Sequence, residues 1–240
     1  MISIIIPTLN EETVIAKTLG ALKKLHAFDY EIIVSDGNST DKTAQIARQY
    51  ADYVLVYKGK ERQTIGGARN SGAKIAKGNY LVFLDADCII PDPDKFFTKA
   101  INIFERDSEI VGIVVSLRVL KEYETISDHL IFGFMNFGHV VTNNILGWGS
   151  GAGEFQMIRK DVFDALDGYN EKFAAVEDNE MFARLSKVGK TRMVRTLTVF
   201  HTGRRAHKIG WPRLLGLWFL NGISSMFFKR SFSKEWKVIR

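Results

Sequence analysis

Short apolar segments alternate with helix-length segments through the first ninety residues, and this alternation restricts the fold more than any other feature of the chain. Each apolar segment is rich in Ile, Val and Leu, as strands buried on both faces of a sheet are. They span residues 2–6, 30–37, 53–57 and 79–87. Helical patterns lie between them, the first expected to begin at an Asn10 cap. The sequence therefore predicts an α/β fold with a mostly parallel central sheet flanked by helices.

Polar side chains follow three of these strands at the point where each strand ends. Residues 8–11 follow the first strand, Asp36 ends the second, and Asp85 and Asp87 follow the fourth. In a parallel sheet with right-handed crossovers the carboxyl ends of the strands meet at one edge, where such sheets bind ligands. We therefore expect these side chains to converge on one binding site.

The second half of the chain has a looser pattern. It predicts helices at 93–105 and 176–189, strands at 110–120 and 192–201, an aromatic segment at 129–141, and a glycine-rich loop running into a short strand at 147–158. No internal repeat or low-complexity linker is present. The simplest organisation is one domain with a C-terminal appendage.

The composition is that of an ordinary globular protein. The 240 residues are 46% hydrophobic and 25% charged, which suffices for a substantial core and carries no signature of disorder. Cys88 is the only cysteine, so an internal disulfide and a cysteine zinc site are excluded, as suits a reducing compartment. The apolar N-terminus lacks the basic region of a secretory signal and predicts a strand.

The last forty residues are basic and apolar. Nine Lys and Arg residues but one Glu follow His201, while the whole chain carries a net charge of +6, so the rest is nearly neutral. Fifteen uncharged residues separate Arg213 from Lys229, fewer than the roughly twenty that a membrane-spanning helix needs. The segment predicts either a helix in the membrane interface, attracted to anionic headgroups, or a helix buried against residues 129–141. A nucleic-acid partner is not expected, because aromatic and polar residues are not interleaved here.

Asp85 and Asp87 form the best candidate for a metal site. Side chains two positions apart in an extended segment point the same way, so both carboxylates can face one ligand. Two hard oxygen donors suit Mg²⁺ or Mn²⁺, which also take phosphate oxygens. The alternative is a solvated turn or a cap for the helix at 93–105. The position after a buried strand, opposite the other polar clusters, favours the metal.

Two further polar residues have an ordinary and a functional interpretation. Asp36 is either the first residue of a turn or a carboxylate that accepts hydrogen bonds from a ribose or a base. Arg69 is either a surface arginine or a bidentate contact to phosphate or base.

Four motifs carry a family resemblance: PTLNE at 7–11, SDGNSTD at 35–41, GGARNSG at 66–72 and LDAD at 84–87. In this order and at these spacings they resemble glycosyltransferase family 2, whose members have the GT-A nucleotide-diphospho-sugar fold. Residues 176–178 resemble the acceptor-side motif of that family. The resemblance implies a metal-dependent, inverting hexosyltransferase that moves a sugar from a UDP- or GDP-sugar to an acceptor.

The resemblance also implies roles for individual residues. The implied donor-binding residues are Pro7, Thr8, Leu9, Glu11, Asp36, Arg69, Asp85, Ala86 and Asp87. Among them, Asp87 would hold Mg²⁺ or Mn²⁺ on the diphosphate, and Asp85 would face the ribose or the sugar beside it. Many GT-A enzymes place a late histidine on the same metal, so His201 is a third candidate ligand. Its alternative is a structural role.

Asp178 is the implied general base, with Glu177 as the second candidate. An acceptor hydroxyl is a weak nucleophile and needs a positioned base, while the leaving diphosphate needs its charge neutralised. Both acids also fit a helix N-terminus, where the helix dipole favours them. Arg204 and Arg205 would either close over the diphosphate or begin the basic tail. The GWGSGAG loop, with Trp148, resembles the acceptor-side segment.

The expected organisation is a GT-A domain over residues 1–205, with a donor half at 1–92 and an acceptor half at 93–205, and a membrane-associating segment at 206–240. The tail favours an acceptor held at the membrane, a polyprenyl phosphate or a lipid-linked saccharide, and attachment through residues 209–240 to the cytoplasmic face.

Three alternatives to this function stay open. The acceptor can be a soluble saccharide or polysaccharide. A nucleotidyltransferase that forms sugar nucleotides has a similar sheet, but PTLNEE is acidic and lacks the glycine-rich, basic phosphate loop of that class. A membrane-binding scaffold with an inactive transferase fold is the third, and the intact Asp85, Asp87 and Asp178 argue against it.

Overall fold

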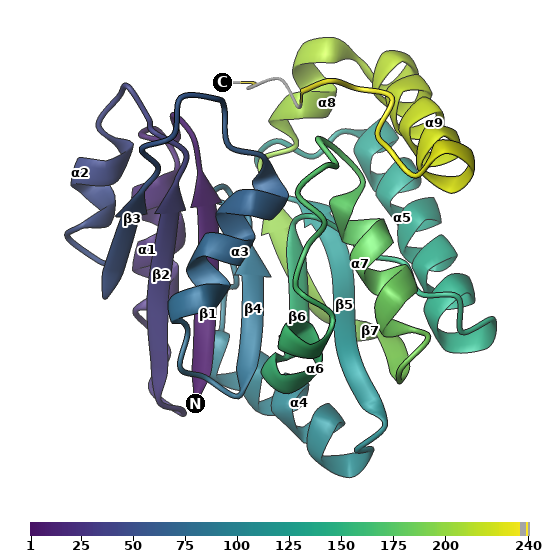
Figure 1. Cartoon of the computed structure of the whole chain (residues 1–240), viewed down its shortest axis with the longest axis horizontal. Helices are drawn as coiled ribbons and strands as arrows, with labels where there is room; N and C mark the ends of the chain where they lie inside the picture. Colours follow the sequence, from purple (N-terminus) through teal and green to yellow (C-terminus); the bar gives the residue numbers. More distant parts are fainter. Residues whose placement is uncertain (236–238, 240) are drawn as a thin grey trace.

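A seven-stranded sheet runs through the centre of the molecule (Figure 1), in a computed structural model that describes residues 1–235 and 239. The strand order is β3-β2-β1-β4-β6-β5-β7. The strands are β1 Ile2–Thr8, β2 Tyr30–Asp36, β3 Tyr53–Val56, β4 Tyr80–Leu84, β5 Ile110–Val119, β6 Phe155–Arg159 and β7 Lys190–His201. All neighbouring strands are parallel except β6, which is antiparallel to β4 and β5. The predicted α/β fold with a mostly parallel sheet is confirmed.

Helices cover both faces of this sheet (Figure 1). They are α1 Ile15–Leu22, α2 Thr43–Ala47, α3 Ile65–Ile75, α4 Pro93–Arg106, α5 Ile126–Val140, α6 Lys160–Ala165, α7 Glu177–Leu185, α8 Arg204–Ile209 and α9 Trp211–Phe228. A π-helical turn, Val141–Ile145, extends α5. The apolar side chains of α1, α4 and α5 pack on one face of the sheet, and those of α3, α6 and α7 pack on the other.

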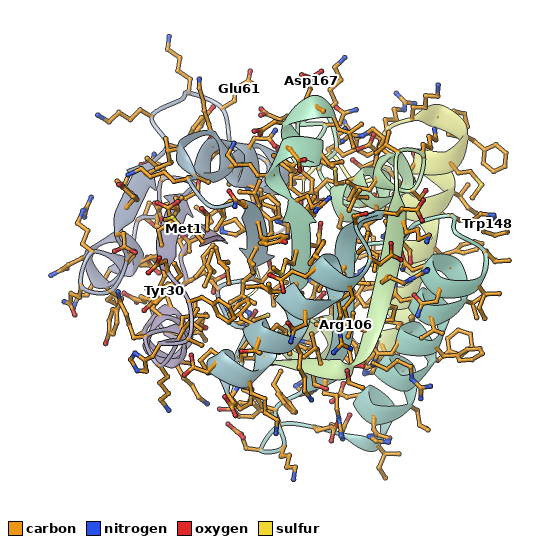
Figure 2. The ribbon with its side chains drawn as sticks, turned by 90° about the horizontal axis from the view of Figure 1, so that it is seen from below. Met1, Tyr30, Glu61, Arg106, Trp148 and Asp167 are labelled. Atoms are coloured by element: carbon orange, nitrogen blue, oxygen red, sulfur yellow. The ribbon has the colours of Figure 1, made fainter. Side chains whose placement is uncertain are left out.

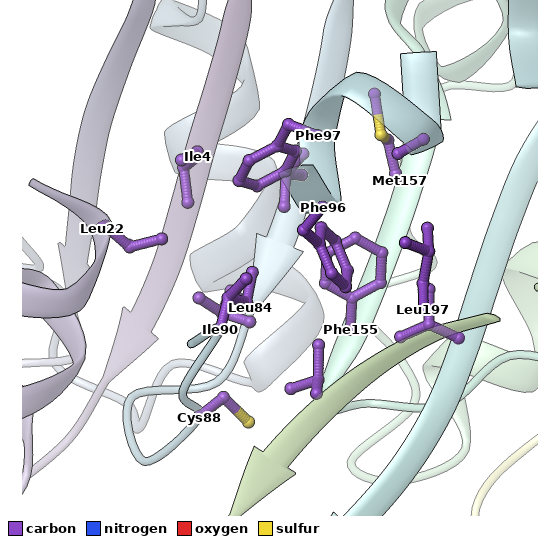
Figure 3. Close-up of a cluster of buried hydrophobic side chains, with 14 of the residues drawn as sticks. Ile4, Leu22, Leu84, Cys88, Ile90, Phe96, Phe97, Phe155, Met157 and Leu197 are labelled. Atoms are coloured by element: carbon purple, nitrogen blue, oxygen red, sulfur yellow. The ribbon is translucent and has the colours of Figure 1, made fainter. Parts of the chain in front are cut away.

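The isoleucines of β1 show why the sheet is buried on both sides. Ile4 joins a cluster with Leu22, Leu84 and Phe96 (Figure 3), whereas its neighbour Ile5 points into the second cluster. Successive side chains of a strand point to opposite faces, so an unbroken apolar run requires helices on each face. Cys88 is buried in the first cluster.

The first helix does not begin at Asn10, and the expected cap is wrong. Asn10 has a positive φ of 56°, and α1 begins only at Ile15. The Asn10 side chain instead accepts a hydrogen bond from the backbone N–H of Thr40, at 2.8 Å. An Asn tolerates this left-handed conformation, and the bond ties the loop after β1 to the loop after β2.

The C-terminal helices lie beside α5 (Figure 1). The rings of Trp211 and Phe132 are 5.4 Å apart between centroids, and Trp211 Nε1 donates to Asp128 Oδ1 at 2.9 Å. The inner side of the C-terminal segment therefore packs on residues 129–141, as one of the two interpretations of this segment predicts. Within residues 1–235 and 239, no helix combines the length and the apolar character needed to cross a bilayer. Lys237 and Arg240 of the predicted basic tail lie outside the described residues.

Candidate active site

A cavity of about 1110 Å³ opens at the carboxyl edge of the sheet. Of the twelve residues that the sequence predicts for the site, eleven line this cavity. They are Pro7, Thr8, Leu9, Glu11, Arg69, Asp85, Ala86, Asp87, Glu177, Asp178 and His201. These residues come from loops and helix ends far apart in the sequence, and the parallel sheet brings them to one place, as expected.

Asp36 does not belong to the cavity wall. It is buried, and both carboxylate oxygens accept hydrogen bonds, from the Thr8 hydroxyl at 2.9 Å and from the backbone N–H and hydroxyl of Ser39. Asp36 thus links the end of β1 to the loop after β2. Its direct contact with a nucleotide stays a prediction.

The loop after β1 is joined to the C-terminal segment by an ion pair. Arg204 binds Glu11 with two short hydrogen bonds, of 2.6 and 2.7 Å, and its Nε lies 3.2 Å from Asp87 Oδ2. Glu11 is buried, and fork-shaped contacts of this kind fix geometry as well as charge. Arg204 therefore lies at the cavity, where it pairs with the carboxylates of Glu11 and Asp87.

Asp85 and Asp87 both line the cavity but have different partners. Asp85 accepts a hydrogen bond from Arg69 Nη2 at 3.2 Å, while Asp87 accepts one from the Thr202 hydroxyl and pairs with Arg204. Burial raises the pKa of the Asp85 carboxyl, Arg69 opposes that rise, and neighbouring carboxylates add to it. The two aspartates are therefore electrostatically distinct, because Asp87 pairs with Arg204, which also binds Glu11, whereas Asp85 pairs with the buried Arg69.

Arg69 is buried at the centre of the site and is not the surface arginine of the ordinary interpretation. It lies on α3, whose first turn is capped by Thr64. Its guanidinium donates to Glu177 at 2.9 Å, to Asp85 and to the Gly153 carbonyl at 2.8 Å, and it lies over the Tyr169 ring. One arginine thus holds the β4 loop, the glycine-rich loop and the start of α7 together.

Glu177 and Asp178 occupy the first turn of α7, where the helix dipole favours acids. Glu177 is buried and paired with Arg69, whereas Asp178 accepts hydrogen bonds from Asn179. The pKa values of both carboxyls are raised, chiefly by burial. A carboxyl with a raised pKa binds a proton more readily, which suits a general base. Because Glu177 is held by Arg69, Asp178 is the one better placed to meet a ligand.

The glycine-rich loop before β6 packs against α7 so closely that side chains do not fit. A Cβ atom on Gly151 would lie 2.4 Å from the Asp178 carbonyl oxygen, and one on Gly149, which has a φ of 74°, would lie 2.1 Å from the Phe182 oxygen. Asn143 fixes the loop by exchanging hydrogen bonds with Ser150. Trp148, at the outer end of this loop, points away from the molecule (Figure 2).

We expect Gly151→Ala to displace the start of α7 and to lower both stability and activity. The added methyl group clashes with backbone, which cannot rotate away, so the free energy of unfolding should fall by about 1–3 kcal/mol. Gly138→Ala, on α5, is the matched control, because a Cβ there meets nothing within 4 Å; it should be neutral or stabilising by up to about 1 kcal/mol. Urea unfolding of both variants measures the difference, and equal midpoints would contradict the expected clash.

His201 ends β7 beside the aspartates. Its Nδ1 accepts a hydrogen bond from the Gly203 N–H at 3.2 Å, while Nε2 is buried and has no hydrogen-bond partner in the part of the chain that the structure describes. Burial lowers the pKa of the ring, and Asp87 and Asp85 oppose this. Buried polar atoms usually have partners, so Nε2 is available to a ligand; the predicted contact of His201 with a metal stays a prediction.

Glu154 is a cavity residue that the sequence prediction missed. It ends the glycine-rich loop directly before β6, just as Asp85 directly follows β4. The sequence carries the same signal at both positions, because Glu154 directly precedes a buried strand and Asp85 directly follows one. The antiparallel direction of β6, which brings its start to the same edge, was not predicted.

The fold and the site together define a class, the GT-A nucleotide-sugar-dependent transferases. The chain belongs to glycosyltransferase family 2: the family model described as "Glycosyl transferase family 2" matches residues 3–167. The resemblance expected from the four motifs is therefore confirmed.

Curated relatives match parts of the chain. It is 33% identical over 111 residues to a PGL/p-HBAD biosynthesis glycosyltransferase of Mycobacterium tuberculosis, covering 45% of this chain and 43% of the relative. It is 29% identical over 197 residues to the succinoglycan biosynthesis protein ExoA of Rhizobium meliloti, covering 78% of this chain and 58% of the relative. The chain thus spans less than two thirds of the length of these relatives.

Solved structures share the fold at low sequence identity. A mannosyltransferase from Pyrobaculum calidifontis, solved with GDP-Man and Mn²⁺, is 18% identical with a TM-score of 0.66, over 84% of this chain and 56% of that one. A glucosyl-3-phosphoglycerate synthase from Mycobacterium tuberculosis, solved with Mn²⁺ and UDP-Glc, is 19% identical with a TM-score of 0.64, over 95% and 78%.

Proposed function

We propose that the protein transfers a sugar from a nucleoside-diphosphate sugar to an acceptor held at a membrane surface, with inversion at the anomeric carbon. The convergence of eleven predicted residues on one cavity is the observation that carries this proposal. The UDP-sugar and GDP-sugar complexes of the structural relatives support the donor class. The loops at residues 7–11 and 85–87 would bind the nucleotide diphosphate, as the family resemblance implies.

The chemistry assigned to this chain is a single displacement. Asp178 takes the proton of the acceptor hydroxyl while the hydroxyl oxygen bonds to the anomeric carbon and the bond to the diphosphate breaks, releasing a nucleoside diphosphate. Glu177 and Asp85 are held by Arg69 and so shape the site around Asp178. Arg204 supplies positive charge beside Asp87, where the charge of the leaving group develops.

The residues at the donor side fit a divalent metal ion. Asp87 offers carboxylate oxygens, Asp85 lies beside it, and His201 Nε2 is a buried nitrogen that has no hydrogen-bond partner among residues 1–235 and 239. In the same residues, no group of three or more His, Cys, Asp or Glu side chains is arranged to hold a metal ion. An ion bound at Asp87 would therefore need further oxygens from phosphate and water. Mg²⁺ or Mn²⁺ bound there would neutralise the diphosphate.

Nucleotide binding and product analysis test this function. We expect calorimetry to show binding of UDP or GDP that strengthens with Mn²⁺, and Asp87→Ala to abolish the strengthening. Asp161→Ala, an exposed aspartate on α6, is the control. Incubation with the matching sugar nucleotide should release a nucleoside diphosphate. Release of pyrophosphate from a nucleoside triphosphate would instead show a nucleotidyltransferase, and the absence of any nucleotide binding would favour a scaffold.

The proposed membrane attachment rests on an apolar surface formed by α5 and α9. Its members are Ile126, Leu130, Phe134 and Phe137 of α5 and Phe219, Phe227 and Phe228 of α9, all largely exposed. On α5 these side chains recur every third or fourth residue and so form one stripe. Basic residues lie at both ends of α9, with Arg213 in its first turn and Lys229 and Arg230 directly after its last residue. An apolar surface with basic flanks suits anionic lipid headgroups.

The inner sides of the same helices support a lipid acceptor. Apolar side chains from α5 and α9 line the cavity: Phe132, Met135, Trp211, Leu214 and Trp218. The cavity is thus polar at Asp87 and Asp178 and apolar toward the helices that carry the exposed surface. This gradient suits an acceptor with a polar end and an apolar chain, bound from the cytoplasmic face. A lipid-linked saccharide would present the hydroxyl that Asp178 deprotonates, whereas a polyprenyl phosphate would attack through a phosphate oxygen, which needs no such base.

Vesicle sedimentation tests the attachment. We expect the protein to bind vesicles containing phosphatidylglycerol, more weakly at high salt because charge attraction is screened. Phe219→Glu should weaken binding about tenfold or more, since a buried Phe contributes about 1.5–3 kcal/mol. Val188→Glu, also at an exposed apolar residue but on neither helix, is the control. Equal binding of both variants would contradict the proposed surface.

A further inference from the structure

Glu154 lies on the wall of the cavity, and the mechanism proposed above does not use it. Leu84 of β4 pairs with Phe155 of β6, so Asp85 and Glu154 are the next opposite pair, and the Asp85 N–H donates to the Glu154 carbonyl at 3.2 Å. Side chains directly opposite each other in an antiparallel pair lie on the same face. The Glu154 carboxylate is therefore on the face of Asp85, toward the ligand.

The neighbours of Glu154 place it between the two ends of the site. Burial and Asp87 raise the pKa of its carboxyl, and Glu154 in turn raises the pKa values of Asp85 and Asp178. The adjacent Gly153 lies between the same groups, since a Cβ there would be 3.5 Å from Asp178 Oδ2 and 4.0 Å from Asp85 Oδ2. Glu154 thus lies near the donor-side aspartates and near the proposed base at once.

The Glu154 carboxylate has unused acceptor capacity. No other side chain among residues 1–235 and 239 donates a hydrogen bond to it. Arg69 and Arg205 act on it electrostatically, but the guanidinium of Arg69 is directed at Glu177, Asp85 and the Gly153 carbonyl. Glu154 is only partly buried and lines the cavity, so its carboxylate oxygens can accept hydrogen bonds from a ligand that displaces water there.

Within the proposed function, on which this inference rests, the diphosphate lies at Asp87 and the acceptor hydroxyl at Asp178. The sugar of the donor must bridge the two, because its anomeric carbon is attacked from one side and released from the other. We infer that Glu154 accepts hydrogen bonds from hydroxyl groups of the donor sugar and thereby selects a neutral hexose. The carboxylate of a uronic acid would meet repulsion from Glu154, a means of rejecting the wrong substrate.

Calorimetry without acceptor isolates this interaction. The ligands are UDP, UDP-glucose and UDP-glucuronate, or GDP, GDP-mannose and GDP-mannuronate, according to the nucleotide that binds. We expect Glu154→Gln to leave the Kd of the nucleoside diphosphate unchanged and to raise the Kd of the hexose nucleotide about tenfold, the worth of a hydrogen bond to a charged group. The preference for the hexose over the uronate should shrink by a similar factor. Glu105→Gln, an exposed Glu on α4, should change none of these values.

The outcomes separate this inference from the function on which it rests. An unchanged ratio of hexose-nucleotide to nucleotide affinity in Glu154→Gln would overturn the inference. A change in the acceptor KM alone would also overturn the inference. Loss of the acid limb of the kcat–pH profile with unchanged donor affinity would overturn it too, because Glu154 would then be the general base. Failure of the wild-type protein to bind any nucleoside diphosphate would instead refute the proposed function.

Discussion

Asp178→Asn is expected to lower kcat for sugar transfer by about a hundredfold to ten-thousandfold, the range that a positioned general base contributes. The amide keeps the size of the side chain and can still accept a hydrogen bond from Asn179, but it cannot take a proton. Donor affinity should be unchanged, because the diphosphate is proposed to bind at Asp87 and not at Asp178. Steady-state kinetics combined with calorimetry separates the two effects.

The pH dependence distinguishes loss of a base from loss of structure. Burial raises the pKa of Asp178, and the carboxyl acts as a base only when it is deprotonated. The wild-type rate should therefore fall as the pH drops through a value above the usual range of an aspartate, and Asp178→Asn should lack this limb. A carboxyl whose folded pKa is raised binds more protons in the folded state, so it costs stability as the pH rises. Asp178→Asn should consequently unfold no more easily than the wild type at neutral pH.

Glu177→Gln is the comparison that decides between the two acids. Glu177 is bound to Arg69, so its substitution weakens that ion pair and should affect stability more than the chemical step. If Glu177→Gln removed the acid limb and Asp178→Asn kept it, the roles assigned to the two acids would be reversed.

The central part of the site could be predicted because local rules agree with the fold there. The unbroken isoleucines of β1 and the apolar run of β4 predict strands buried on both faces, and the topology of a parallel sheet sends the residues that follow them to one edge. Asp85 and Asp87 therefore reach the cavity without any tertiary knowledge. The family motifs add the identity of the ligand, which strand patterns do not carry.

The remainder of the site depends on long-range contacts that no local pattern contains. Asn is a common N-cap residue, but the Asn10 side chain accepts a hydrogen bond from Thr40 and so links two loops. Asp36 lies at a strand end where ligand-binding residues are expected, yet both of its carboxylate oxygens accept hydrogen bonds from Thr8 and Ser39. The sequence around Arg69 does not distinguish it from a surface residue of α3, because its partner Glu177 lies 108 positions later, on α7. The bonds from Ser39 to Asp36 are local and fit the turn interpretation of Asp36, but Thr8, Thr40 and Glu177 lie in other parts of the chain, so tertiary packing decides those contacts.

Arg69 is the residue whose removal should cost the most stability. Its side chain is 1% exposed, and it pairs with Glu177, which is 6% exposed, and with Asp85. Removing one partner of a buried ion pair leaves an uncompensated charge, at a cost of about 3–5 kcal/mol. We expect Arg69→Met to lower the free energy of unfolding by this amount and to abolish transfer, because the β4 loop and the start of α7 lose their common anchor. Arg106→Met, an exposed arginine at the end of α4 (Figure 2), should stay within about 0.5 kcal/mol of the wild type.

The pH and a second substitution show whether charge, rather than lost packing over Tyr169, is the cause. Without Arg69, burial raises the pKa values of Glu177 and Asp85 further, so the folded variant binds more protons than the unfolded chain and gains stability relative to wild type as the pH falls. The deficit of Arg69→Met should therefore shrink on acidification. Adding Glu177→Gln should recover part of it, since the double variant buries one unpaired charge fewer. If the loss of unfolding free energy in Arg69→Met were independent of pH and additive with that of Glu177→Gln, lost packing would be its cause. The ion pairs of Arg69 would then not be what stabilises the site.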